Sequence, residues 1–329
     1  MLLACVMMTS CDDAIFDDEG DCVVRYRVHF KYDYNLKFAD AFASEVNQVT
    51  LYVIDSDGKI VWQKTESGAA LAEEDYAMDV DVVPGTYSLL AWCSSENPKT
   101  FAIGNDGTRN SLKTDFFTEK HEDGSFHIDR QLDCLYPGYL PDVTFPTVDE
   151  GTFDFTMPLL KDTNHFVITL QQMSGEAIDK DLINFEIVDD NTSLDWDNTP
   201  ITGTPVTYHQ WYSTNVSADI NSKSAEDNGK FSGVVAELTT SRLMMSNRAN
   251  ARLRIYRNDN NKTIASIRLI DALLLVKGYE LEKKLTDQQY LDYKDEYNMT
   301  FFLDADQRWI DCLIQIESWR VVYNEVELD

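Results

Sequence analysis

The chain has 329 residues and a formal net charge of −29 at pH 7, because 57 acidic residues stand against 28 basic ones. This excess of negative charge repels a phosphate backbone and excludes nucleic acid as a partner. Hydrophobic residues make up 43% of the chain and aromatic residues 12%, which excludes a disordered protein and provides for packed cores. At roughly 150 residues per domain, the length predicts two domains.

The N-terminus has the composition of an export signal. Residues 1–10 are apolar and contain no acid, and the segment that follows Cys11 is rich in acid. This pattern is typical of the end of a signal peptide and its cleavage site, although the basic segment that normally begins a signal peptide is missing. The alternative is a hydrophobic N-terminal strand with a free cysteine. Beyond these residues, no run of about 18 apolar residues predicts a transmembrane helix.

Cys11 follows two small residues, as the modified cysteine of a bacterial lipobox does. In such a motif the cysteine becomes the new N-terminus after cleavage and carries the lipid. Cys5 lies in a second motif of this kind, but almost no hydrophobic segment precedes it. We therefore predict a signal-peptide end at residues 1–10, lipid attachment at Cys11 and an acidic tether over residues 11–21.

The remaining cysteines allow disulfides in an exported protein. They are Cys22, Cys93, Cys134 and Cys312, and the three connectivities open to them are not distinguished by the sequence. No CxxC motif and no cluster of histidine and cysteine occurs, so the sequence does not predict a zinc site.

Alternating apolar and polar residues predict strands through the first half of the chain. A hairpin is expected around Asp57-Gly58, because an Asp-Gly pair between two apolar runs favours a tight turn. Pro84-Gly85 predicts another turn. The expected strands cover residues 22–32, 48–54, 59–63, 76–83, 86–92 and 151–157. Residues 97–146 are rich in Gly, Asp, Asn and Pro and predict loops with short strands.

The second half continues this pattern. Strands are expected at residues 165–170, 184–188, 251–256, 262–269, 309–316 and 319–328. Residues 271–276 fit a short helix or a strand, and a short helix is predicted at 285–291 with Thr286 as its N-cap and Gln289 three residues later. Short strands at about ten-residue spacing favour β-sandwiches over a parallel α/β fold. We predict a mainly all-β protein with two β-sandwich domains, residues 22–160 and 161–329.

The motifs of common enzymes are missing from the sequence, which contains no GxSxG, GxxxxGK[ST], HExxH or GxGxxG. We therefore predict no enzymatic activity, no catalytic residues and no cofactor. His121 and His127 lie six residues apart and suit either a metal pair or a solvated polar loop. The oxygen-rich segment 189–198 suits calcium or an ordinary acidic turn, and it lacks the register of an EF-hand. In both cases the prediction is the loop, and no metal.

The tryptophans divide into two groups. Trp92, Trp309 and Trp319 stand in strand patterns and are predicted to be core residues. Trp196 and Trp211 stand in turn-rich segments and are the better candidates for an exposed surface that stacks on sugars.

Several segments together resemble the FimB-type fimbrial anchor lipoproteins of Bacteroidales, the fimbrillin-associated anchor subunits. They are Cys11 with its acids and Cys22, VHFKYDYN (28–35), FADAF (38–42), VTLYVID (49–55) with Gly58, PGTY (84–87), AW (91–92), MPLLKDTN (157–164), SRL (241–243), LID (269–271), QYLD (289–292), YNMTFFL (297–303) and IQIESW (314–319). Their order and spacing cover nearly the whole chain. One departure is Glu317-Ser318, where the family tends to have an Asn-Gly-like turn.

The resemblance implies two transthyretin-like β-sandwich domains and a lipid anchor in the outer membrane, with a palmitate-type modification of the cysteine. It also implies a place at the base of a fimbria, attachment of the fibre, limitation of its length and strand exchange with the pilin. In strand exchange one subunit's strand fills a groove in its neighbour. The alternative is a carbohydrate-binding surface lipoprotein of a gut bacterium, with a glycan as ligand.

The C-terminus is the expected contact with the adjoining subunit. Apolar residues change parity after Ile316 and again before the last two of them, so turns or bulges are expected near residues 317–318 and 324–325. The residues predicted to contact the pilin are Trp319, Val321, Tyr323, Val326 and Leu328. The alternative is that this strand simply closes the second domain.

Overall fold

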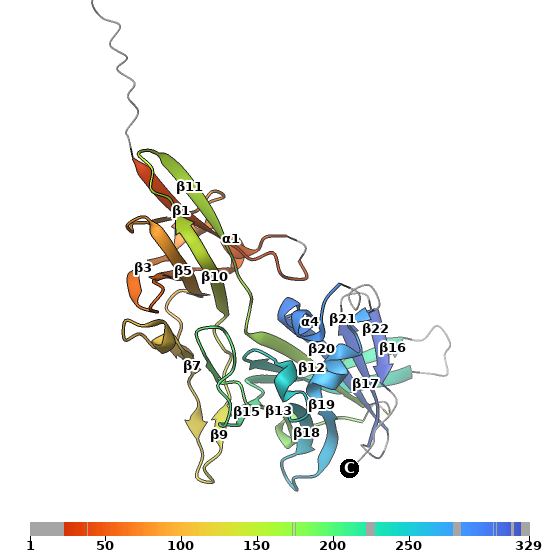
Figure 1. Ribbon diagram of the computed structural model, residues 1–329. Helices are drawn as coiled ribbons and strands as arrows, with labels where there is room; N and C mark the ends of the chain where they lie inside the picture. The colour runs from red at the N-terminus through yellow and green to blue at the C-terminus, as the bar shows by residue number, and fades with distance from the viewer. Residues whose placement is uncertain are drawn as a thin grey trace, which may run out of the picture.

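The computed structural model describes residues 23–37, 39–172, 174, 176–221, 228–278, 284–304, 306, 308–316 and 319–323. They are mainly β-structure, as predicted, with short helices (Figure 1). The helices are α1 Phe42–Glu45, α2 Leu269–Leu274 and α4 Asp287–Tyr293. Helix α4 begins at the predicted cap, where Thr286 and Gln289 form a capping box. The segment 271–276, open from the sequence, is largely the helix α2.

Two sheets near the N-terminus form what we call the N-terminal unit. A three-stranded sheet has the order β11-β1-β4, and a four-stranded sheet has the order β10-β5-β2-β3. Their bounds are β1 Val24–Lys31, β2 Gln48–Ile54, β3 Ile60–Ser67, β4 Met78–Val80, β5 Gly85–Ser94, β10 Leu135–Phe145 and β11 Gly151–Pro158. The hairpin β2–β3 turns at Gly58, whose φ of 79° favours glycine.

Two six-stranded sheets and one small sheet form the C-terminal unit. Their orders are β16-β17-β12-β20-β21-β22, β19-β18-β13-β15-β9-β8 and β14-β7-β6. The bounds are β6 Phe101–Ile103, β7 Thr114–Phe116, β8 Glu119–Lys120, β9 Phe126–Ile128, β12 Asn164–Gln172, β13 Ile183–Asp189, β14 Ser193–Leu194, β15 Val206–His209, β16 Tyr212–Asn221, β17 Asn228–Thr240, β18 Arg252–Arg257, β19 Thr263–Arg268, β20 Glu296–Leu303, β21 Trp309–Ile316 and β22 Trp319–Tyr323.

Strands β6 to β9 come from the first half of the chain but join sheets of the second half. Strand β9 pairs in parallel with β15, and β7 pairs with β14. The chain therefore leaves the N-terminal unit after β5, contributes to the C-terminal unit and returns as β10. Two strand regions escaped the sequence pattern, the long β10 and the β15–β17 region, because their alternation is interrupted by glycine, proline and polar residues.

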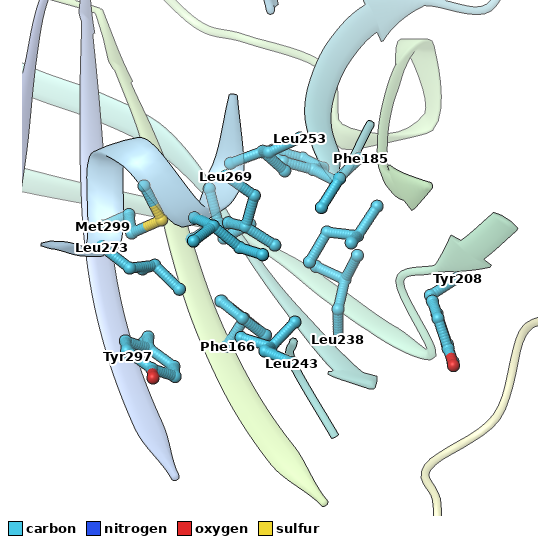
Figure 2. Packing of buried hydrophobic residues seen from close by; sticks show 14 of the residues in the cluster. Phe166, Phe185, Tyr208, Leu238, Leu243, Leu253, Leu269, Leu273, Tyr297 and Met299 are labelled. Carbon is cyan, nitrogen blue, oxygen red and sulfur yellow. The ribbon is translucent and has the colours of Figure 1, made fainter. Parts of the chain in front are cut away.

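Strands β2 and β5 are buried on both faces. Leu51 and Val53 pack into the core of the N-terminal unit, whereas Tyr52 and Ile54 pack into the larger core that continues through the C-terminal unit. The side chains of β5 likewise alternate between the two cores, and its run LLAWCS is buried throughout. This two-sided burial explains why both strands read as continuous apolar runs rather than as alternating ones. The larger core also holds Phe166, Phe185, Leu253 and Tyr297 (Figure 2).

The cysteines that the structure describes do not pair with one another. Cys93 is buried in the core of the N-terminal unit, Cys134 is half-buried at the start of β10, and neither forms a disulfide with Cys312. The disulfides that the sequence allowed among these three are thus not formed. Cys22 lies outside the described residues.

Candidate functional site

Strand β22 lies at an edge of a six-stranded sheet. It pairs antiparallel with β21 on one side, from Ile316 opposite Trp319 to Cys312 opposite Tyr323. Three of the predicted contact residues, Trp319, Val321 and Tyr323, stand at alternate positions of this strand. Val326 and Leu328 lie outside the described residues, as do Glu317 and Ser318, and so does Cys11.

Strand β1, at the other end of the chain, is held on both sides. It pairs in parallel with β11 over all eight residues and antiparallel with β4. Arg27 also makes a paired hydrogen bond to Asp154 of β11, with distances of 2.8 and 3.1 Å. Removing β1 would break two ladders, whereas removing β22 would break one.

The junction between the two units carries a buried ion cluster. Lys161 Nζ lies 2.5 Å from Asp295 Oδ2 and 3.5 Å from Glu45 Oε2, and the Tyr136 hydroxyl donates to Glu45 at 2.8 Å. Burial acts to lower the pKa of Lys161, but the neighbouring carboxylates outweigh it and raise the pKa above its ordinary value. Because Glu45 and Tyr136 belong to the N-terminal unit and Asp295 precedes β20, this lysine ties the units together.

The next residue, Asp162, belongs to a second buried cluster. Its Oδ1 accepts a hydrogen bond from Asn198 Nδ2 at 3.0 Å and lies 3.9 Å from Arg242 Nε. Arg242 makes a bidentate pair with Asp292, with both distances 2.9 Å, and donates to the Asn198 carbonyl. Arg242 therefore fixes the 195–199 turn next to the first residues of the second half of the chain.

Two acceptors in this second cluster lack a partner, Asp162 Oδ2 and Asn198 Oδ1. They belong to residues that are already joined by one hydrogen bond. A proton on Asp162 Oδ2 can donate to Asn198 Oδ1 and close an acid–amide pair, which satisfies both. Burial raises the pKa of Asp162 to about 7 against the opposing effect of Arg242, in agreement with this protonated form.

The two candidate tryptophans occupy different surroundings. Trp196 lines a cleft of about 320 Å³ between the units, together with Trp92, Tyr139 and Arg242. One face of Trp196 is covered by the guanidinium of Arg109, 4.3 Å from the ring centre, and Tyr139 packs against it edge-on. Trp211 is not part of this cleft. Trp92 is buried, as predicted.

The histidine pair of the sequence meets a third histidine. His121 stacks on His127 with ring centres 3.7 Å apart, and His127 Nδ1 lies 2.7 Å from His209 Nε2. Burial and the neighbouring His127 lower the pKa of His209 to about 4. The sequence could not single out His209, because it joins the pair only through the parallel β9–β15 ladder. The other ring nitrogen of His127, Nε2, lies 2.6 Å from Ser125 Oγ.

Acids of segment 189–198 accept hydrogen bonds from protein groups, and Asp189 accepts from the amide of Asn247. Asp190 accepts from the backbone of Gly203 and Thr204, and Asp195 accepts from the backbone N–H of Trp196. In the part of the chain that the structure describes, no three His, Cys, Asp or Glu side chains are arranged to hold a metal ion. No described helix is both long and apolar enough to cross a membrane.

Comparison with known proteins assigns the chain to a family. The model of the fimbrillin-A associated anchor proteins Mfa1 and Mfa2 matches residues 18–325. The chain belongs to this family. The predicted resemblance to fimbrial anchors is thereby confirmed, and so is the absence of enzymatic activity, since the family is structural. As an anchor-family member, the protein has a fimbrial anchor or adhesin-type role, associates with fimbrial subunits and belongs to the cell envelope.

Solved structures agree with this family. A putative adhesin from Bacteroides thetaiotaomicron is 31% identical, with 90% of this chain and 96% of the other covered and a TM-score of 0.77. A putative polysaccharide-binding protein from the same organism is 26% identical, with 93% and 99% covered and a TM-score of 0.74. The fimbrial anchor protein Mfa2 from Porphyromonas gingivalis shares the fold at 14% identity, with 90% and 98% covered and a TM-score of 0.61. A search of curated proteins found no match.

The acid–amide pair makes the stability of this anchor-family protein depend on pH in a defined direction. An unfolded Asp has a pKa of about 3.9, so between roughly pH 4 and pH 7 the folded chain binds a proton on Asp162 that the unfolded chain does not. This contribution therefore falls as pH rises through that window, by at most about 4 kcal/mol. The variant Asp162→Asn keeps the paired geometry without a titrating group. The free energy of unfolding of this variant minus that of the wild type should therefore increase between about pH 4.5 and about pH 8.

Urea unfolding of both proteins at several pH values measures this difference. Val83→Ala, at an exposed side chain without a titrating group, is the control and should keep a nearly constant difference from the wild type. A constant difference for Asp162→Asn as well would contradict the acid–amide pair.

Proposed function

We propose that the protein is an outer-membrane lipoprotein that holds a fimbria at its base, limits the length of the fibre and joins the pilin by strand exchange. The observation that carries this proposal is the unequal hold on the two terminal strands. Among the described residues, strand β1 has a ladder on both sides, and β22 has a ladder on one side. A tethered N-terminus and a detachable C-terminal strand are what a base subunit requires.

The segment between Cys11 and the described body is long enough for the proposed tether. Eleven residues lie between Cys11 and Val23, the first described residue, and a fully extended chain of these twelve residue steps spans roughly 40 Å. Its acids keep the segment solvated. We propose that the lipid on Cys11 holds this tether in the membrane, while the body stands free to receive the fibre.

Limitation of fibre length follows from the same asymmetry. A subunit in the fibre must both give a strand and accept one. In this protein β1 is already paired on both sides, with β11 and β4. We propose that the subunit therefore accepts no further strand at its tethered end, and that the fibre stops there. Strand exchange itself rests on β-augmentation, in which an edge strand gains a ladder in its neighbour.

A glycan-binding role is the weaker candidate. The cleft between the units contains Trp92, Tyr139 and Trp196, and aromatic rings of this kind bind sugars. The face of Trp196 is already occupied by Arg109, however, and Trp92 is buried. The cleft therefore offers little free ring surface for stacking.

The lipid at Cys11 is tested in the native host with the complete signal peptide restored. The wild-type protein should partition into the detergent phase and give an acylated N-terminal peptide that begins at Cys11, because stable anchoring requires at least two acyl chains. Cys11→Ala should remain in the aqueous phase, and Cys5→Ala serves as the control with unchanged partitioning. A wild-type protein that is soluble and unaffected by Cys11→Ala would contradict the proposal.

The role of the C-terminal strand is tested by truncation after Ser318. The shortened protein should still reach the membrane but release fimbriae into the medium, because β22 is removed while β21 and the core stay in place. Shed fibres are measured by immunoblot of the culture supernatant, and folding by protease resistance of the purified protein. A folded truncation that retains its fibres would sink the strand-exchange proposal, and an unfolded one would assign β22 to the core.

A further inference from the structure

The sheet that contains β22 has a second free edge. Strand β16, Tyr212–Asn221, pairs antiparallel with β17 along all ten residues, and within the described residues no strand lies on its other side. Figure 1 shows β16 on the flank of the C-terminal unit that faces away from the N-terminal unit. A free edge presents a row of backbone N–H and C=O groups that can accept another strand.

Several other sheet edges of the molecule are protected. Strand β3 carries Lys64 and is covered at its start, where the N–H of Ile60 donates to the carbonyl of Gly107 at 2.9 Å. Strand β19 carries the exposed Arg268 and has a bulge at Ile264. The edge strands β4, β6, β8 and β14 have two or three residues each. Short length, bulges and basic residues are the usual devices against unwanted strand pairing.

Strand β16 has none of these devices. Its sequence, YSTNVSADIN, contains no Lys, Arg or Pro, and its register with β17 runs without a bulge. Tyr212 is 46% exposed at its beginning. The strand is also as long as the long central strand β5. An edge of this length without protection marks a place where another strand binds.

We propose that β16 is a docking edge for an extended strand of the same fimbrial subunit that receives β22. This inference rests on the proposed anchor function. The two edges are five strand spacings apart, or roughly 24 Å at about 4.8 Å per spacing, which one subunit of domain size can reach. Two contacts on one neighbour strengthen attachment by raising the local concentration of the second.

The negative charge of this chain indicates which partner strand can bind at β16. The only charged residue of β16 is Asp219, and the chain as a whole carries a net charge of −29. A second copy of this chain would bring the same negative charge and be repelled. The docking strand therefore carries neutral or basic side chains beside Ser213 and Ser217, which offer hydroxyl groups on one face of the strand. The amide of Asn215, between them, already bonds the backbone of Ile178 and Lys180.

Hydrogen exchange tests the docking directly. The purified full chain is mixed with fimbriae from cells that lack it, and binding is measured by co-sedimentation. Peptides covering residues 212–217 should exchange about tenfold more slowly in the bound state, because their outward N–H groups gain partners. The protected strand β3, residues 60–67, is the control and should not change. Binding without protection of residues 212–217 would overturn the inference.

Two neighbouring proline variants separate docking from folding. Backbone N–H groups alternate between the two sides of a strand, so in Ser213→Pro and Thr214→Pro one loses a bond to β17 and the other loses an outward donor. The variant that loses less stability is the one that has kept its bond to β17 and lost the outward donor. It should bind fimbriae about tenfold more weakly. Val216→Lys adds a basic residue of the kind that protects β3 and should weaken binding without removing any backbone donor.

The outcomes distinguish this inference from the anchor function. If truncation after Ser318 sheds fimbriae while folded β16 variants bind them normally, the docking edge is refuted and the anchor function stands. If the wild-type chain does not bind fimbriae at all, both are refuted. If the chain alone forms a dimer in solution that Val216→Lys dissolves, β16 serves a second copy, and the proposed occupant is wrong.

Discussion

The two-sided burial of the β10-β5-β2-β3 sheet is the constraint on which the rest of the structure depends. One face of β2 and β5 closes the core of the N-terminal unit, and the other face forms part of the core that extends through the C-terminal unit. Ordinary sandwich sheets turn one face to water. Here Tyr52 and Trp92 are buried on the second face. Strands β6 to β9 and the sheets of the C-terminal unit cover that face.

The polar clusters at the junction complete this arrangement. Lys161 and Asp162 are consecutive, yet each enters a different buried network, one shared with Glu45 and the other with Arg242. Buried charges of this kind contribute little net stability but are costly to separate. The Lys161 cluster joins residues of both units, and the Arg242 cluster fixes the 195–199 turn beside it.

Much of this could be predicted from the residues alone. Alternation identified β1 and β12, the Asp-Gly pair identified the β2–β3 hairpin, and the Thr286 cap identified α4, because each signal is local. The insertion of β6 to β9 into the other unit was not predictable, since the parallel pairing of His127 with Thr207 joins residues far apart in sequence. The long β10 was hidden by Pro137 and Gly138, and Gly138 is required there because a Cβ would lie 2.7 Å from Leu159.

The junction was hidden for a similar reason. The segment MPLLKDTN supported the family resemblance, but nothing in the sequence indicates that Lys161 meets Asp295 or that Asp162 meets Asn198. The site residues on β22 are placed at a sheet edge by the pairing, which parity alone could not establish. Parity fixes which residues share a face, and only the sheet order decides which strand is outermost.

The central claim is that the two hydrophobic cores, which lie on opposite faces of the β10-β5-β2-β3 sheet, unfold together. Equilibrium unfolding in urea, followed by pulsed hydrogen exchange of β1 and of β13, tests it most directly. Chains of this size commonly unfold in separate steps. Because both faces of the β10-β5-β2-β3 sheet are buried, we expect β1 and β13 to lose protection at the same urea concentration. Two midpoints, with one unit fully protected after the other has unfolded, would contradict this account.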